Sequence, residues 1–119
     1  MKNKFYFNLI ILCLFFFHKN LIAKDLNINA ETLDLDKSNQ TINAQGNVQV
    51  TDDQNNIINS DKIKYDKNKD VLNTFGETQI LTSEKYKIKG KDITYDNANG
   101  IVYSNTETEI TDLNGNSIF

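Results

Sequence analysis

The stretch "DKIKYDKNKD", residues 61–70, decides the fold, because thirty residues later the chain repeats its pattern as "KDITYDNANG", residues 91–100. In both stretches apolar residues alternate with polar ones, and a run of turn-forming residues follows. Strict alternation is typical of a half-buried β-strand. A fixed internal period of this size is typical of stacked supersecondary units. The sequence therefore predicts tandem β-units that bury their apolar faces against one another.

The same thirty-residue spacing organises the chain from residue 28 to residue 118. Five columns of this alignment contain only apolar residues, although the chain is 39% apolar: Ile28, Ile58, Ile88 and Ile118; Leu33, Ile63 and Ile93; Leu35, Tyr65 and Tyr95; Ile42, Leu72 and Val102; Val50, Ile80 and Ile110. Such agreement indicates about three copies of one hairpin unit.

Each unit predicts an antiparallel hairpin whose facing residues lie on one side of the sheet. The expected pairs are Leu35 with Ile42 and Leu33 with Ala44, Tyr65 with Leu72 and Ile63 with Thr74, and Tyr95 with Val102 and Ile93 with Ser104. Asp36, Asp66 and Asp96 precede the turns, where a carboxylate can accept hydrogen bonds from backbone amides two residues on. We therefore interpret these aspartates as turn starters rather than as a calcium-binding ladder.

Glycine recurs at one place in the second strand of the unit, as Gly46 and Gly76, with Thr106 in the third copy. Glycine inside a strand usually marks a bulge or a sharp bend. We expect each strand to turn a corner there, and we expect bulges within residues 60–63 and 90–93, where the alternation slips. The predicted fold is all-β and antiparallel, with hairpins stacked into two facing sheets as a jellyroll-like sandwich or a short solenoid.

The first twenty-three residues differ in kind from the rest. Lys2 and Lys4 precede an apolar run over residues 5–17, and Ala23 is a small residue at the end of the segment. This arrangement predicts a secretory signal peptide over residues 1–23, followed by one domain over residues 24–119. A retained membrane anchor is the alternative, although the apolar run is shorter than the roughly 20 residues that span a bilayer.

Without that segment the chain has ten Lys, sixteen acidic residues, no Arg, no Cys and no His. Nucleophile–histidine pairs and zinc–imidazole sites are therefore excluded, so we expect no enzyme, no metal site and no cofactor. The acidic balance disfavours nucleic acid as a partner. The lysines of residues 85–91 predict a solvated strand face or a protected sheet edge; contact with anionic groups such as lipid phosphates is the alternative.

Two consecutive units carry a family resemblance: "INAETLDLDKSNQTINAQGNVQV", residues 28–50, and "INSDKIKYDKNKDVLNTFGETQI", residues 58–80. Their hydrophobic–acid–turn–hydrophobic–glycine order resembles the OstA-like domains of bacterial lipopolysaccharide transport. These domains occur in the periplasmic bridge protein LptA and in the N-terminal periplasmic part of the outer-membrane assembly protein LptD. The resemblance covers residues 28–118, and Thr106 departs from the glycine of the pattern.

The resemblance implies a β-jellyroll in the periplasm whose two sheets splay apart and hold lipid acyl chains. It implies lipopolysaccharide as the ligand, association with the outer membrane, and end-to-end strand pairing with other jellyroll domains. The inward-facing columns would then be the lipid-binding groove: Leu33, Leu35, Ile42, Val48, Val50, Ile63, Tyr65, Leu72, Ile80, Ile93, Tyr95, Val102 and Ile110. A closed core built from the same residues is the alternative.

Ile118 stands in the first column of a fourth unit. This position favours the N-terminal part of an LptD-type assembly protein, in which further chain would follow, over a free LptA-like bridge. A retained N-terminal anchor would instead fit an LptC-like role. A structural β-repeat or adhesin module, with a packed interior and no lipid, is the alternative of another class.

Overall fold

The computed structural model describes residues 25–118, and all regular secondary structure in this range is β-strand. All strand pairs are antiparallel and belong to one nine-stranded sheet. The strands are β1 (Asn27–Asn29), β2 (Thr32–Asp36), β3 (Thr41–Thr51), β4 (Ile57–Asp66), β5 (Val71–Leu81), β6 (Lys87–Lys91), β7 (Thr94–Asp96), β8 (Ile101–Tyr103) and β9 (Glu109–Thr111). The prediction of an all-β antiparallel fold is confirmed.

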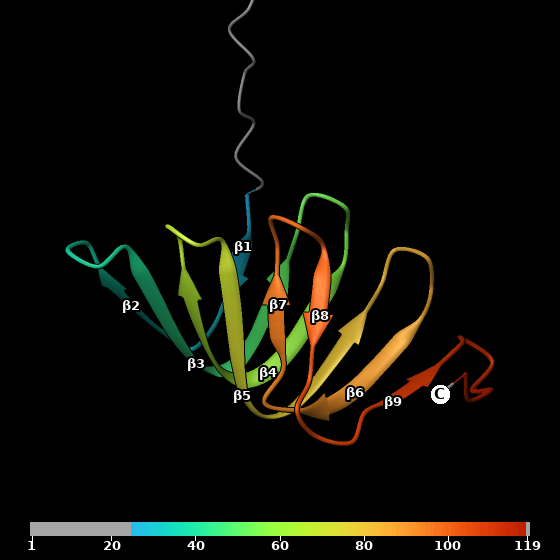
Figure 1. Cartoon of the computed structure of the whole chain (residues 1–119). Helices are drawn as coiled ribbons and strands as arrows, with labels where there is room; N and C mark the ends of the chain where they lie inside the picture. The colour runs from blue at the N-terminus through green and yellow to red at the C-terminus, as the bar shows by residue number, and fades with distance from the viewer. Residues whose placement is uncertain (1–24, 119) are drawn as a thin grey trace, which may run out of the picture.

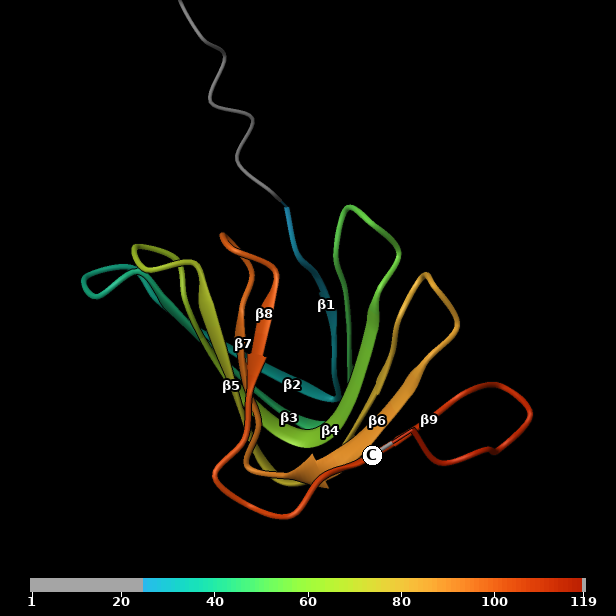
Figure 2. The ribbon, with the colours of Figure 1, turned by 45° about the vertical axis from the view of Figure 1, so that its right-hand side comes forward.

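The sheet is folded into a V (Figure 1, Figure 2). One side, here called the first arm, contains β2, β7 and β8 together with one half of each of β3, β4 and β5. The other side, the second arm, contains β1, β6 and β9 with the remaining halves of the same three strands. The two expected facing sheets are thus two halves of one hydrogen-bonded ladder, because β3, β4 and β5 are long enough to run through both.

The bend of the V lies where the alternation of the sequence slips. The register between β3 and β4 shifts between Gln45 and Val48, and the register between β4 and β5 shifts between Ser60 and Lys62. Gly46 and Gly76 lie at these shifts with φ angles of +85° and +83°, a region that residues with a side chain avoid. The predicted corner at both glycines and the predicted bulge after Ser60 are therefore confirmed.

The first two hairpins have the predicted register. Leu35 faces Ile42 and Leu33 faces Ala44, and the second unit repeats this with Tyr65 facing Leu72 and Ile63 facing Thr74.

The third unit is less regular than the first two. Tyr95 faces Val102 as predicted, but the pairing of Ile93 with Ser104 is absent from the described ladder. Asp92 has a φ angle of +50° and its carboxylate accepts a hydrogen bond from the Gly76 amide at 2.7 Å, so the chain leaves the strand between β6 and β7. Where the earlier units have glycine, Thr106 donates its hydroxyl to the Lys91 carbonyl at 3.0 Å, and β8 and β9 remain separate.

The turn aspartates act as predicted. Asp36 Oδ1 accepts hydrogen bonds from the amides of Ser38 and Asn39 at 2.9 and 3.1 Å, and Asp66 binds the equivalent amides of its own turn at the same distances. Asp96 accepts from the Asn99 amide at 3.1 Å. The bonds from Asn39 and Ser38 hold the pKa of Asp36 below its ordinary value.

Residues 1–24, which include the predicted signal peptide over residues 1–23, lie outside the described residues. Within residues 25–118 the structure contains no helix that is long and apolar enough to cross a lipid bilayer.

Candidate functional site

Two rows of apolar side chains line the inner faces of the V. In the first arm, facing residues on six neighbouring strands form the row Leu35, Ile42, Tyr65, Leu72, Tyr95 and Val102. In the second arm, the corresponding row is Ile28, Val50, Ile58, Ile80, Ile88 and Ile110. Because side chains alternate between the faces of a strand, these rows are produced directly by the period-2 pattern of the sequence.

The two rows are buried at their centres and open at their ends. Leu72, in the middle of the first-arm row, is fully buried, as is Ile63 beside the row on β4. Leu35, at the end of the row on the edge strand β2, is 49% exposed, and Leu33 on the same strand is 53% exposed. The remaining predicted groove residues divide in the same way. Val48, Val50, Tyr65, Ile80, Ile93 and Tyr95 are buried, and Ile42, Val102 and Ile110 are partly buried.

The structure thus brings the predicted residues together on one inner surface, whose centre is filled by the protein's own side chains. Three further isoleucines, Ile28, Ile58 and Ile88, complete the second-arm row and were not among the predicted groove residues. The signal for them was present in the sequence, because they form the first apolar column of the thirty-residue alignment.

The base of the V is polar. The hydroxyls of Ser60, Thr74 and Thr78 are buried there and form a hydrogen-bonded chain, in which Thr78 donates to Thr74 at 2.7 Å and Thr78 Oγ1 lies 3.2 Å from Ser60 Oγ. Thr74 Oγ1 also accepts the Ile93 amide at 2.9 Å. These bonds satisfy hydroxyl and amide groups that lie away from water and fix β4, β5 and the start of β7 relative to one another.

A tyrosine from the first arm reaches the second arm near the outer end of the V. The Tyr95 hydroxyl donates a 2.6 Å hydrogen bond to Asp52 Oδ2, which also accepts the Asn56 side-chain amide at 2.7 Å. Burial acts to raise the pKa of Asp52, but these bonds and those from the Asn56 and Gln54 amides outweigh it and hold the pKa below its ordinary value. Burial, followed by the bond to Asp52, raises the pKa of Tyr95 well above its ordinary value.

Tyr65, one unit earlier, makes a similar bond within a single arm. Its hydroxyl donates to Asp70 Oδ1 at 2.6 Å, and Asp70 also accepts the Asn97 side-chain amide at 2.9 Å. Burial, followed by the bond to Asp70, raises the pKa of Tyr65 well above its ordinary value. Both tyrosines therefore pack inside the V, as the sequence predicts, with their hydroxyls bound to carboxylates.

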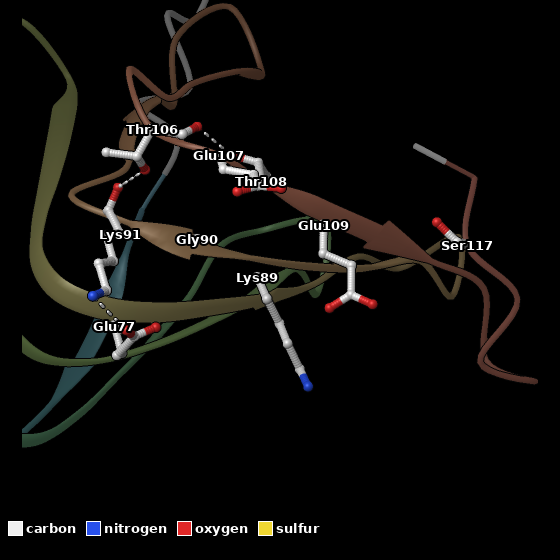
Figure 3. A pocket seen from close by; sticks show the side chains of 9 residues that line it. All are labelled: Glu77, Lys89, Gly90, Lys91, Thr106, Glu107, Thr108, Glu109 and Ser117. Atoms are coloured by element: carbon white, nitrogen blue, oxygen red, sulfur yellow. Dashed lines mark hydrogen bonds and ion pairs between the residues drawn. The ribbon is translucent and has the colours of Figure 1, made fainter.

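A hollow beside β6 lies outside the apolar rows (Figure 3). It has a volume of about 800 Å³ and is lined by Glu77, Lys89, Gly90, Lys91, Thr106, Glu107, Thr108, Glu109 and Ser117. Lys91 Nζ lies 3.1 Å from Oε1 of Glu77, its partner on the neighbouring strand β5, and both side chains are mostly exposed. This charged, open surface does not suit an acyl chain, and none of the predicted groove residues lines it.

Among the described residues, no three His, Cys, Asp or Glu side chains are grouped so as to hold a metal ion. A comparison with protein-family models and a comparison with curated proteins gave no match, so the chemistry of the apolar rows is the basis for assigning a function.

Proposed function

We propose that this chain is a periplasmic lipopolysaccharide-transport domain of the OstA-like type, a β-jellyroll of about three thirty-residue units. Its inner surface shields lipid A acyl chains while the lipid is delivered to the outer membrane. The N-terminal part of an LptD-type assembly protein is the form we favour; a free LptA-like bridge, or an anchored LptC-like protein, is the alternative.

The observation that supports this proposal best is the pair of unbroken apolar rows on facing arms, each extending across six strands. Each methylene group removed from water contributes about 0.8 kcal/mol, so a fatty acyl chain strongly favours such a surface. A row of similar apolar side chains presents nearly the same environment at each strand, which suits a lipid that must move along it.

The open edges of the sheet support the proposed end-to-end contacts. In the described residues β2 and β8 each pair on one side only, and Leu33 and Leu35 present apolar side chains on the β2 edge. An unpaired strand edge offers backbone hydrogen-bonding groups to a strand of another domain. Addition of such a strand beside β2 would continue the apolar row into the next domain.

The test is photo-crosslinking to lipopolysaccharide from a photoreactive amino acid at Leu35, compared with the same amino acid at Asp34. These neighbours on β2 differ in the face that they occupy, because Leu35 pairs with Ile42 of the apolar row and Asp34 pairs with Asn43 on the opposite face. We expect crosslinks from position 35 and few from position 34. Equal crosslinking at both positions, or none at either, would contradict the proposal.

A structural β-repeat or adhesin module is the second candidate, favoured by the packed centre of the interior, where Ile63 and Leu72 are fully buried. Such a module would self-associate through its open edges and take up no lipid. Sedimentation of the purified chain with and without lipopolysaccharide separates the two functions, since only the transport domain would change its mass by binding the lipid.

A further inference from the structure

The bond between Tyr95 and Asp52 crosses the opening of the V. Tyr95 lies one residue before the outer end of β7 in the first arm, and Asp52 directly follows the last residue of β3 in the second arm. The two are 6% and 7% exposed, and their oxygens are 2.6 Å apart. A hydrogen bond from a hydroxyl to a buried carboxylate is among the stronger kinds in proteins.

The carboxylate is fixed on its own arm before Tyr95 reaches it. Asp52 Oδ1 accepts the amides of Gln54 and Asn56 at 2.9 and 2.8 Å. Asn56 Oδ1 in turn accepts the Ser83 amide at 2.8 Å, which connects the loop after β3 to the loop after β5. Asp52 is therefore a rigid attachment point, and opening the V at this place requires its bond to Tyr95 to break.

The interior behind this bond is a cluster of apolar side chains that are shielded from solvent. Ile63, Leu72 and Ile93 are at most 1% exposed, and Ile80 and Tyr95 of the same core cluster are 2% and 6% exposed. An acyl chain can reach these side chains only after the arms separate. The step that admits the ligand is thus also the step that breaks the Tyr95–Asp52 bond.

We propose that the Tyr95–Asp52 hydrogen bond is a latch that holds the two arms closed and sets the rate at which acyl chains enter. This inference rests on the proposed lipid-binding function. When only a fraction of the molecules is open, the apparent affinity for a ligand falls by that fraction. Weakening the latch therefore raises both the rate of uptake and the apparent affinity.

The first test uses a matched pair of tyrosines, Tyr95→Phe and Tyr65→Phe. Each variant loses one interior hydroxyl that donates to a carboxylate at 2.6 Å, but Tyr65 and its acceptor Asp70 belong to the same arm. The full chain is mixed with the fluorescent fatty acid cis-parinaric acid, and the lipopolysaccharide-displaceable fluorescence rise is timed by stopped flow. We expect Tyr95→Phe to take up the probe roughly tenfold faster than Tyr65→Phe, the change expected for loss of a hydrogen bond to a charged group.

The second test uses a matched pair of aspartates, Asp52→Asn and Asp112→Asn. Asp112 accepts the amides of Asn114 and Asn116 and the Asn116 side chain, the same turn bonds as Asp52, and the hydrogen bonds described for it come from its own loop. Asp52→Asn should accelerate uptake, whereas Asp112→Asn should leave it at the wild-type rate. The comparison of these two variants tests whether the Tyr95–Asp52 bond limits uptake even if Tyr95→Phe fails to fold. Far-ultraviolet circular dichroism would reveal such a failure.

The outcomes separate the latch from the proposed function. The latch is overturned if Tyr95→Phe takes up the probe no faster than Tyr65→Phe and Asp52→Asn no faster than Asp112→Asn. Lipid binding would remain supported in that case, because all variants would still take up the probe. Absence of displaceable probe binding by the wild-type chain overturns lipid binding and the latch together.

Discussion

Gly46 and Gly76 occupy equivalent places in β3 and β5 and differ in what surrounds them. Both have φ angles near +85°, but a Cβ atom at Gly46 would lie 2.5 Å from a carboxylate oxygen of Glu31, whereas one at Gly76 would meet nothing within 4 Å. Glu31 is held in that position by a 2.6 Å hydrogen bond from the Asn47 side chain. A side chain would therefore strain the backbone at both sites, but it would clash with a neighbouring residue only at Gly46.

Replacement of each glycine by alanine separates these two effects. Gly76→Ala should lower the free energy of unfolding by about 1–2 kcal/mol, the cost of a left-handed conformation in a residue with a side chain. Gly46→Ala should lower it further, because Glu31 must also move. Urea denaturation of both variants measures the difference, and equal losses would show that Glu31 moves aside at no cost.

Asp52 should make the stability of the protein depend on pH. Its pKa is below the ordinary 3.8 in the folded state, so its contribution is complete above that pH and is lost as the pH falls through the folded-state pKa. Asp52→Asn should lower the free energy of unfolding by about 1–3 kcal/mol at pH 7. The difference from wild type should shrink below pH 4, and a difference that stays constant from pH 7 to pH 3 would contradict this assignment.

At the scale of the strands, the thirty-residue period predicted the first two hairpins to the residue, because alternation and turn chemistry are local properties. It also located the bend, since a glycine and a slip in alternation coincide there. The third unit could not be predicted as well. Its course depends on Asp92 and Thr106, whose hydrogen bonds to Gly76 and Lys91 are contacts between segments that the repeat does not encode.

The hydroxyl chain at the base of the V belongs to this scale, because it joins neighbouring strands. Thr74→Val keeps the shape of the side chain but leaves the Ile93 amide and the Thr78 hydroxyl without the Thr74 oxygen. We expect a loss of about 1–3 kcal/mol in the free energy of unfolding, since all three groups lie in the buried base. Thermal unfolding monitored by circular dichroism would measure it, and an unchanged midpoint would indicate that water replaces the hydroxyl.

At the scale of the molecule, the sequence predicted which side chains share the inner surface but not how far that surface is filled. Alternation assigns a residue to one face of the sheet, but it does not determine the distance between the two facing arms. That distance depends on the angle of the bend and on contacts such as Tyr95 with Asp52, which are 43 residues apart in the chain. The exposure of Leu33 and Leu35, in contrast with the burial of Ile63, is a consequence of strand order at the edge of the sheet.

The course of the strands through the bend gives the molecule unequal mechanical stiffness along its length. β3, β4 and β5 pass through the corner as single strands, whereas non-strand residues separate β1 from β2, β6 from β7 and β8 from β9. Amide hydrogens of β8 and β9 should therefore exchange with deuterium sooner than those of β3 to β5. A molecule built in this way yields first at the edges of its sheet, so that any widening of the V would spread from the compliant edges toward the stiff centre.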